Sequence, residues 1–156
     1  MVLALGDPLS YCSDPRKTFQ EIRRVTKKDG FLIGDVENRY GWIYRRRAQT
    51  WNDVKRILKE GIAYWPGSDG KSPIKMFSPS ELMDVAESTG WEMVGMYPAD
   101  LIVSLVDKDL ITSILANEEM SDNEINQWIA LEEELRLNKH LLGCGKEIQF
   151  VLRKSE

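Results

Sequence analysis

The sequence is poor in metal-binding and cross-linking residues, with one histidine (His140) and two cysteines, Cys12 and Cys144. No C-x-x-C pair occurs, so we expect no metal site. Two isolated thiols are typical of a reducing compartment, which favours the cytoplasm. No apolar run approaches the roughly 20 residues that cross a bilayer, and no basic leader follows Met1. We therefore expect neither a membrane span nor a signal peptide.

The sequence also has no excess of basic residues, because it contains 21 Lys and Arg against 25 Asp and Glu, for a net charge of −4. Nucleic acids and anionic membranes are bound through a basic face that displaces counterions. The composition therefore argues against both as partners. The one basic run, Arg45-Arg46-Arg47, would point in three directions on a helix, as solvated charges do.

What is present is the composition of one folded domain, which we expect to span residues 1–156, with 42% hydrophobic residues. The apolar run Val2–Leu5 is typical of a parallel strand covered on both faces. Asp14 and Pro15 predict a helix start, and Gly30 a left-handed stop. The next strand is Phe31–Val36. The narrow apolar stripe of the intervening helix is Phe19, Ile22 and Val25.

The second half of the chain has the clearest local signals. Ser78-Pro79-Ser80-Glu81 is a capping box, so a helix is expected to begin there and to end at Gly90, before a strand over Trp91–Tyr97. Ser121 and Glu124 repeat this pattern, and the final strand is Ile148–Leu152. Between these elements we expect further helices at Thr50–Glu60, with Val54, Ile57 and Leu58 inward, and at Asp109–Asn117.

Four stretches in this order resemble the C-terminal half of class I S-adenosylmethionine-dependent methyltransferases, a Rossmann-like family. Val2 to Tyr11 looks like the family's fourth strand and the following loop, and Glu21–Phe31 is similar to its "E-x-x-R-V-L-K-P-G-G" wording, with Lys27-Lys28-Asp29-Gly30 departing from it. Phe77–Trp91 looks like the "f-s-p-e-e-L…a-G-F" segment, and Gly145–Lys154 like the seventh strand.

The resemblance implies an α/β fold holding half of the family's sheet, with strands equivalent to the fourth to seventh and the last strand antiparallel. Residues 38–76 and 101–142 are then insertions. The resemblance also implies S-adenosylmethionine as cofactor of the complete enzyme. The family's glycine-rich cofactor turn is absent, because no G-x-G-x-G follows a strand. We therefore expect this chain alone to bind no cofactor and to be inactive.

By the resemblance, Leu5, Gly6 and Asp7 would contact the cofactor, and Ser10 and Tyr11 the methyl acceptor. Asp7 could equally be a turn residue before proline, and Tyr11 a packing residue. The second strand end offers Glu37, Asn38 and Arg39, as acceptor contacts or as residues that cap the following backbone. Catalytic residues are not identifiable, and His140 lies in an insertion.

Two hypotheses about function remain open. In the first, the chain is a C-terminal fragment of a methyltransferase whose N-terminal half is supplied elsewhere, for example by a separate partner, or is lost. In the second, it is a non-catalytic assembly or partner-binding module derived from one. Either way, the strand Val2–Leu5 would have an unpaired edge, which predicts a homo-oligomer with this strand as the seam.

Overall fold

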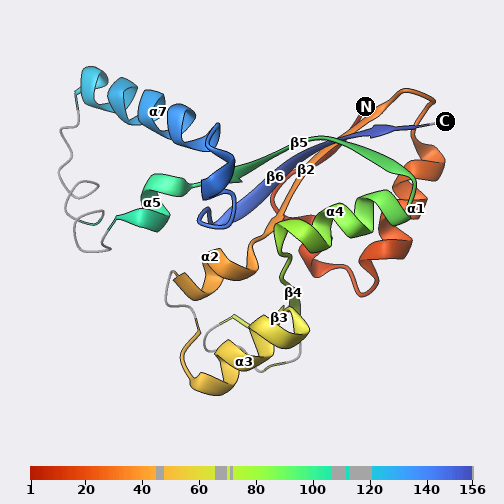
Figure 1. Ribbon diagram of the computed structural model, residues 1–156, viewed down its shortest axis with the longest axis horizontal. Coiled ribbons are helices and arrows are strands. Elements are labelled where there is room, and N and C mark those ends of the chain that lie inside the picture. Colours follow the sequence, from red (N-terminus) through yellow and green to blue (C-terminus); the bar gives the residue numbers. More distant parts are fainter. Residues whose placement is uncertain (45–47, 66–69, 71, 107–111, 113–120, 156) are drawn as a thin grey trace.

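The computed structural model describes residues 1–44, 48–65, 70, 72–106, 112 and 121–155. Its centre is a four-stranded sheet in the order β1-β2-β6-β5 (Figure 1). β1 and β2 are parallel, whereas β6 runs antiparallel to both of its neighbours. This arrangement confirms the α/β fold and the antiparallel last strand predicted from the sequence. The strands are β1 (Val2–Ala4), β2 (Phe31–Glu37), β5 (Trp91–Ala99) and β6 (Glu147–Lys154).

Helices α1 (Pro15–Val25) and α4 (Pro79–Ser88) cover one face of the sheet (Figure 1). Alternate residues of the strands point toward them, and burying each such side chain contributes roughly 1.5–3 kcal/mol. The Nε1–H of Trp91 also donates to the carbonyl of Phe19, at 3.1 Å. The fully buried side chains of this main core include Phe19, Leu32, Val36, Leu82, Ala86, Ile148, Phe150 and Leu152.

The opposite face of the sheet is open at its β1 edge. Leu3 is 56% exposed and Leu5 61%, and Phe31 on β2 is 38% exposed. Among the described strands, β1 pairs with β2 alone, in parallel. The expectation that Val2–Leu5 is covered on both faces is therefore wrong for the described residues. The apolar run buries only the face that Val2 and Ala4 present to the core.

The ends of α1 and α4 follow from their capping residues. Asp14 caps α1 by accepting from the N–H of Lys17 at 3.0 Å. The predicted left-handed stop at Gly30 is wrong, because α1 ends at Val25, five residues earlier, and the positive φ (57°) belongs to Asp29. Val25 is also exposed rather than inward. In α4 the predicted capping box is confirmed, and Gly90 has the left-handed φ of 82°.

The described residues of the range 38–76 form a small unit below the sheet in Figure 1. It contains α2 (Arg39–Tyr44), α3 (Trp51–Glu60) and a two-stranded pairing of β3 (Ile62–Ala63) with β4 (Ile74–Lys75). Ile57 is buried as predicted, but Leu58 is 45% exposed, so its inward prediction is wrong. The unit has a separate core of Trp42, Ile57, Ala63, Ile74 and Met76.

Helices α5 (Leu101–Leu105) and α7 (Asp122–Arg136) project from the other end of the sheet (Figure 1). Glu132 of α7 accepts hydrogen bonds from the first N–H groups of α5, at 2.7 and 2.9 Å. The capping box at Ser121 is confirmed, yet α7 contains no buried residue. The predicted helix Asp109–Asn117 lies outside the described residues. Over the described part of the chain, none of the helices has the length and apolarity to cross a membrane.

Candidate functional site

The loops after β1 and β2 meet at one edge of the sheet, because the two strands are parallel and their carboxyl ends lie together. The N–H of Asp7 donates to Oδ1 of Asp35 at 2.5 Å. In return, the N–H of Glu37 donates to the hydroxyl of Ser10 at 2.8 Å. Ligands of open α/β sheets bind beyond such strand ends. The structure therefore brings together Asp7, Ser10 and Glu37, which the sequence nominated separately.

The turn after β1 has an unusual backbone conformation. Gly6 (φ 80°) and Asp7 (φ 50°) are both left-handed, and aspartate is among the few residues that tolerate this region. Among the described residues, no atom lies within 4 Å of where a Cβ on Gly6 would be. The short helix Pro8–Tyr11 follows directly. The turn thus exposes backbone to an approaching group, and Leu5 beside it is also exposed.

Glu37 is the most unusual side chain of the site. It is 1% exposed, and its Oε2 has no hydrogen-bond partner among the described residues. Burial raises the pKa of Glu37 to about 7, and the negative charge of Asp7 adds to the rise. Lys146 acts in the opposite direction, and Glu147 adds a smaller rise. Burying a carboxylate oxygen without a hydrogen-bond donor costs free energy of folding, and a donor group that reached Oε2 of Glu37 would offset that cost.

Tyr11 and Lys146 border the same site. Tyr11 is 47% exposed. Burial raises the pKa of Tyr11, a hydrogen bond with Trp65 lowers it, and the charges of Asp7 and Glu37 raise it further. Burial lowers the pKa of Lys146, but the Glu147 carboxylate, 2.5 Å from its Nζ, outweighs this and the net shift is upward. Lys146 is therefore a cation already paired within the protein.

Asn38 holds the chain before β6 in place. Its Nδ2 donates to the carbonyl of Gly145 at 2.8 Å, and its Oδ1 accepts from the N–H of Tyr40 at 3.1 Å. The backbone of Gly41 lies so close that an added Cβ would be 2.1 Å from the Gly145 oxygen. These contacts favour the capping interpretation of Asn38 over direct acceptor contact.

Arg39 points away from this edge, into the unit of residues 38–76. It is 8% exposed and forms an ion pair with Glu81 of α4, with Nη2 and Oε1 2.5 Å apart. Its guanidinium also donates to the carbonyls of Leu58 and Met76, at 3.3 and 3.5 Å. Burial raises the pKa of Glu81, but hydrogen bonds from Ser78 and Arg39 outweigh it, so the pKa is lowered. The arginine thus fixes α4 against the unit that follows β2.

Three charged neighbours of the site were not nominated from the sequence: Asp35, Lys146 and Glu147. The signal for Asp35 was a carboxylate inside an otherwise apolar strand. For Lys146 and Glu147 it is the strand pairing, which places Glu147 opposite Glu37 across β2 and β6. His140 is exposed, and the described residues contain no group of three potential metal ligands.

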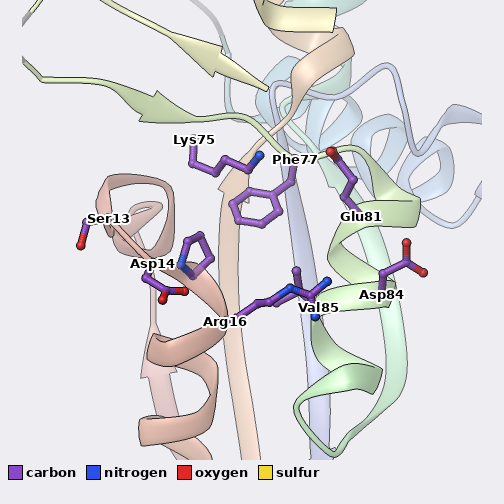
Figure 2. Close-up of a pocket in the computed structure, with 9 residues that line it drawn as sticks. Ser13, Asp14, Arg16, Lys75, Phe77, Glu81, Asp84 and Val85 are labelled. Carbon is purple, nitrogen blue, oxygen red and sulfur yellow. The ribbon is translucent and has the colours of Figure 1, made fainter. Parts of the chain in front are cut away.

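A separate cavity of about 400 Å³ lies between the N-terminal ends of α1 and α4, on the helix-covered face (Figure 2). None of the site residues predicted from the sequence lines it. Its Asp14 and Glu81 already cap these helices, and Arg16 reaches across to the Ser88 hydroxyl. These three charged side chains therefore have partners in the protein. The lining residues are Ser13, Asp14, Pro15, Arg16, Lys75, Phe77, Glu81, Asp84 and Val85.

No protein-family model and no curated protein sequence matches the chain. Solved structures do. An S-adenosylmethionine-dependent methyltransferase from Mesorhizobium loti is 14% identical, with a TM-score of 0.55 over 97% of this chain and 60% of that one. A putative S-adenosylmethionine-dependent methyltransferase from Listeria monocytogenes is 14% identical, with a TM-score of 0.56 over 99% of this chain and 61% of that one. A putative methyltransferase in complex with the Haloferax volcanii Trm112 activator is 16% identical, with a TM-score of 0.50 over 99% of this chain and 53% of that one.

These likenesses establish the fold. The chain has the Rossmann-like α/β architecture of S-adenosylmethionine-dependent methyltransferases, and it spans about 60% of the length of the first two structures.

Proposed function

We propose that this chain is the C-terminal half of an S-adenosylmethionine-dependent methyltransferase. The observation that carries the proposal is the strand order β1-β2-β6-β5, with the antiparallel last strand inserted between β2 and β5. The four sequence stretches that resemble the family independently predict an antiparallel last strand. Almost the whole of this chain aligns with only part of the methyltransferase chains, as a C-terminal half would.

The turn formed by Leu5, Gly6 and Asp7 suits one side of the cofactor. Space around Gly6 is open, and the left-handed backbone allows a ligand to approach closely. S-adenosylmethionine would supply a methyl group carried on a positively charged sulfur. The chain offers a carboxylate, Asp7, beside this turn. The glycine-rich turn and the acidic residue that bind the rest of the cofactor in the family are not in this sequence, so affinity should require the other half.

The acceptor side would be formed by Ser10, Tyr11 and Glu37. Ser10 positions the Glu37 backbone, Tyr11 provides a half-exposed aromatic wall, and Glu37 presents an unsatisfied oxygen. Asn38 and Arg39 would act indirectly, by holding the following segments. Methyl transfer needs chiefly alignment of the acceptor with the methyl group and a suitable electrostatic environment. These residues would supply both.

The second candidate function is a non-catalytic assembly or partner-binding module. The exposed Leu3 and Leu5 and the unpaired edge of β1 favour it, because such an edge invites another chain. The partner would be a second copy of this chain or a separate N-terminal half. The putative methyltransferase in complex with the Haloferax volcanii Trm112 activator was solved with a partner protein, so partner binding is compatible with this fold.

The deciding experiment extends the chain by the in-frame sequence encoded before Met1, over roughly 80–100 residues, or three strand–helix units. Titration calorimetry with S-adenosylmethionine is then compared between the extended and the 156-residue proteins. We expect micromolar affinity for the extended protein and little or none for the chain alone. Micromolar binding by the chain alone would refute the proposal that the cofactor site needs both halves. An extended protein that folds but does not bind S-adenosylmethionine would favour the non-catalytic module.

A further inference from the structure

The Oε2 atom of Glu37 is a buried acceptor that lacks a donor. It has no hydrogen-bond partner among the described residues, although the side chain is only 1% exposed. The nearby cation, Lys146, is engaged elsewhere, with its Nζ 2.5 Å from Glu147 and 3.8 Å from Asp100. An anionic oxygen in this situation is stabilised strongly by any cation that reaches it.

The charges that face Glu37 favour such a cation. Asp7 comes from the loop after β1 and Glu147 from β6, against the single positive charge of Lys146. Tyr11 from the short helix after β1 is the other titratable neighbour. Oδ1 of Asp35 is occupied by the N–H of Asp7. The carboxylates that act on Glu37 therefore outnumber the one cation, Lys146, that the described residues place near it.

A metal ion is not the cation that this geometry suits. The described residues contain no group of three ligands that could hold one. An organic cation needs only one or two carboxylates and can use aromatic side chains as walls. Tyr11 (47% exposed) and Trp65 (41% exposed), which hydrogen-bond to each other, lie on this side.

We propose that Glu37 and Asp7 bind the protonated amino group of an amine, with an N–H of the ammonium donating to Oε2 of Glu37. Within the proposed function, on which this point rests, the amine is the methyl acceptor. An ammonium nitrogen has no free electron pair, so it must lose a proton before it can take a methyl group. The proton would pass from the nitrogen to the Glu37 carboxylate. The raised pKa of Glu37 makes this carboxylate a better proton acceptor.

The test uses the 156-residue chain and two probes of the same shape, 2-phenylethylamine and 2-phenylethanol. Binding is followed by the backbone amide shifts of Asp7 and Glu37 in nitrogen-15 NMR spectra. At about pH 8 the probe amine is charged and Glu37 is ionised. We expect the amine to bind about tenfold more tightly than the alcohol, both in the millimolar range. Equal binding of the two probes would overturn the proposal.

Glu37→Gln should reduce the preference for the amine severalfold, because only Asp7 then remains to attract the ammonium, whereas Glu92→Gln should keep the full preference. Glu92 is a matched control because it pairs with Arg153 at the far end of the same sheet. An undiminished preference in Glu37→Gln would contradict the assignment. Lowering the pH to about 5 tests the same point without a mutation, since protonation of Glu37 should reduce the preference in the parent chain. None of these readouts involves S-adenosylmethionine, so their failure is separable from failure of the methyltransferase proposal.

Discussion

The buried hydroxyl of Ser10 accepts a 2.8 Å hydrogen bond from the backbone N–H of Glu37, and so joins the loop after β1 to the end of β2. Glu37 is consequently held in place through its backbone, while its side chain is left unsatisfied. The bond crosses 27 positions of sequence, so it forms only when β1 and β2 are correctly paired.

Ser10→Ala should lower the free energy of unfolding by about 1–2 kcal/mol, because the buried N–H of Glu37 loses its acceptor. Urea denaturation of the parent and the variant measures this difference. Ser13→Ala is the control, since Ser13 is exposed and its replacement should change little. Equal stability of the Ser10 and Ser13 variants would show that the hydrogen bond contributes nothing measurable to the free energy of unfolding.

Glu37 should make the protein less stable as the pH rises. Its pKa is about 7 when folded, against an ordinary value of 4.5, so between these values the folded chain holds more protons than the unfolded chain. The free energy of unfolding therefore falls through this window, by about 3 kcal/mol in total. Glu37→Gln cannot titrate and should remove this fall, whereas Glu92→Gln should keep it. Denaturation at several pH values measures the slopes, and parallel slopes for the parent and Glu37→Gln would contradict the assignment.

The two serine caps, which the sequence predicts to be equivalent, should differ in their effect on global stability. Ser78→Ala should cost about 1 kcal/mol, because α4 packs Leu82 and Ala86 into the main core. Ser121→Ala should cost less in global unfolding, because α7 buries no residue and can fray alone. Chemical denaturation gives the global cost, and amide hydrogen exchange should show faster exchange at the start of α7. A larger global cost for Ser121→Ala would mean that α7 unfolds together with the sheet.

Gly41→Ala should destabilise the protein by more than about 2 kcal/mol. The added Cβ would lie 2.1 Å from the carbonyl oxygen of Gly145, and backbone cannot swing aside as a side chain can. Gly143→Ala is the matched control, because its Cβ would meet only Tyr40 at an ordinary 3.5 Å. Thermal unfolding of the two variants provides the comparison, in which a tolerated Gly41→Ala would show that the segment before β6 can move away from α2.

Leu3→Lys should weaken self-association if β1 is the seam of the proposed homo-oligomer. Leu3 is 56% exposed on an edge strand that has one described neighbour, and a lysine there discourages strand addition. Light scattering at tens of micromolar protein compares the parent with the variant. A monomeric parent would refute the assembly, and unchanged association of Leu3→Lys would place the seam elsewhere.

The sequence predicted most of the regular elements because their signals are local. Ser78 with Glu81 and Ser121 with Glu124 form the capping boxes that their spacing requires. The side-chain predictions that proved wrong concern burial that depends on partners distant in sequence. Leu58 fits a helical stripe but meets no neighbour that covers it, so it remains exposed.

The candidate site was predictable only in part, for the same reason. Asp7 and Glu37 each follow an apolar strand, and parallel pairing brings such strand ends together. Lys146 and Glu147 could not be included, because their place depends on which strands β6 separates. The inward direction of Arg39 was equally hidden, since its partner Glu81 is 42 positions away.

The position of β6 has a consequence for how the protein is made. Residues 147–154 are synthesised after the other three strands, yet they supply the pairing for the full length of β2 and for β5 on the other side. Until these residues leave the ribosomal tunnel, β2 has only the three paired residues of β1 beside it. The sheet can therefore close only once β6 has emerged from the ribosome. Before that moment β2 and β5 lack the neighbour that pairs with their backbone groups.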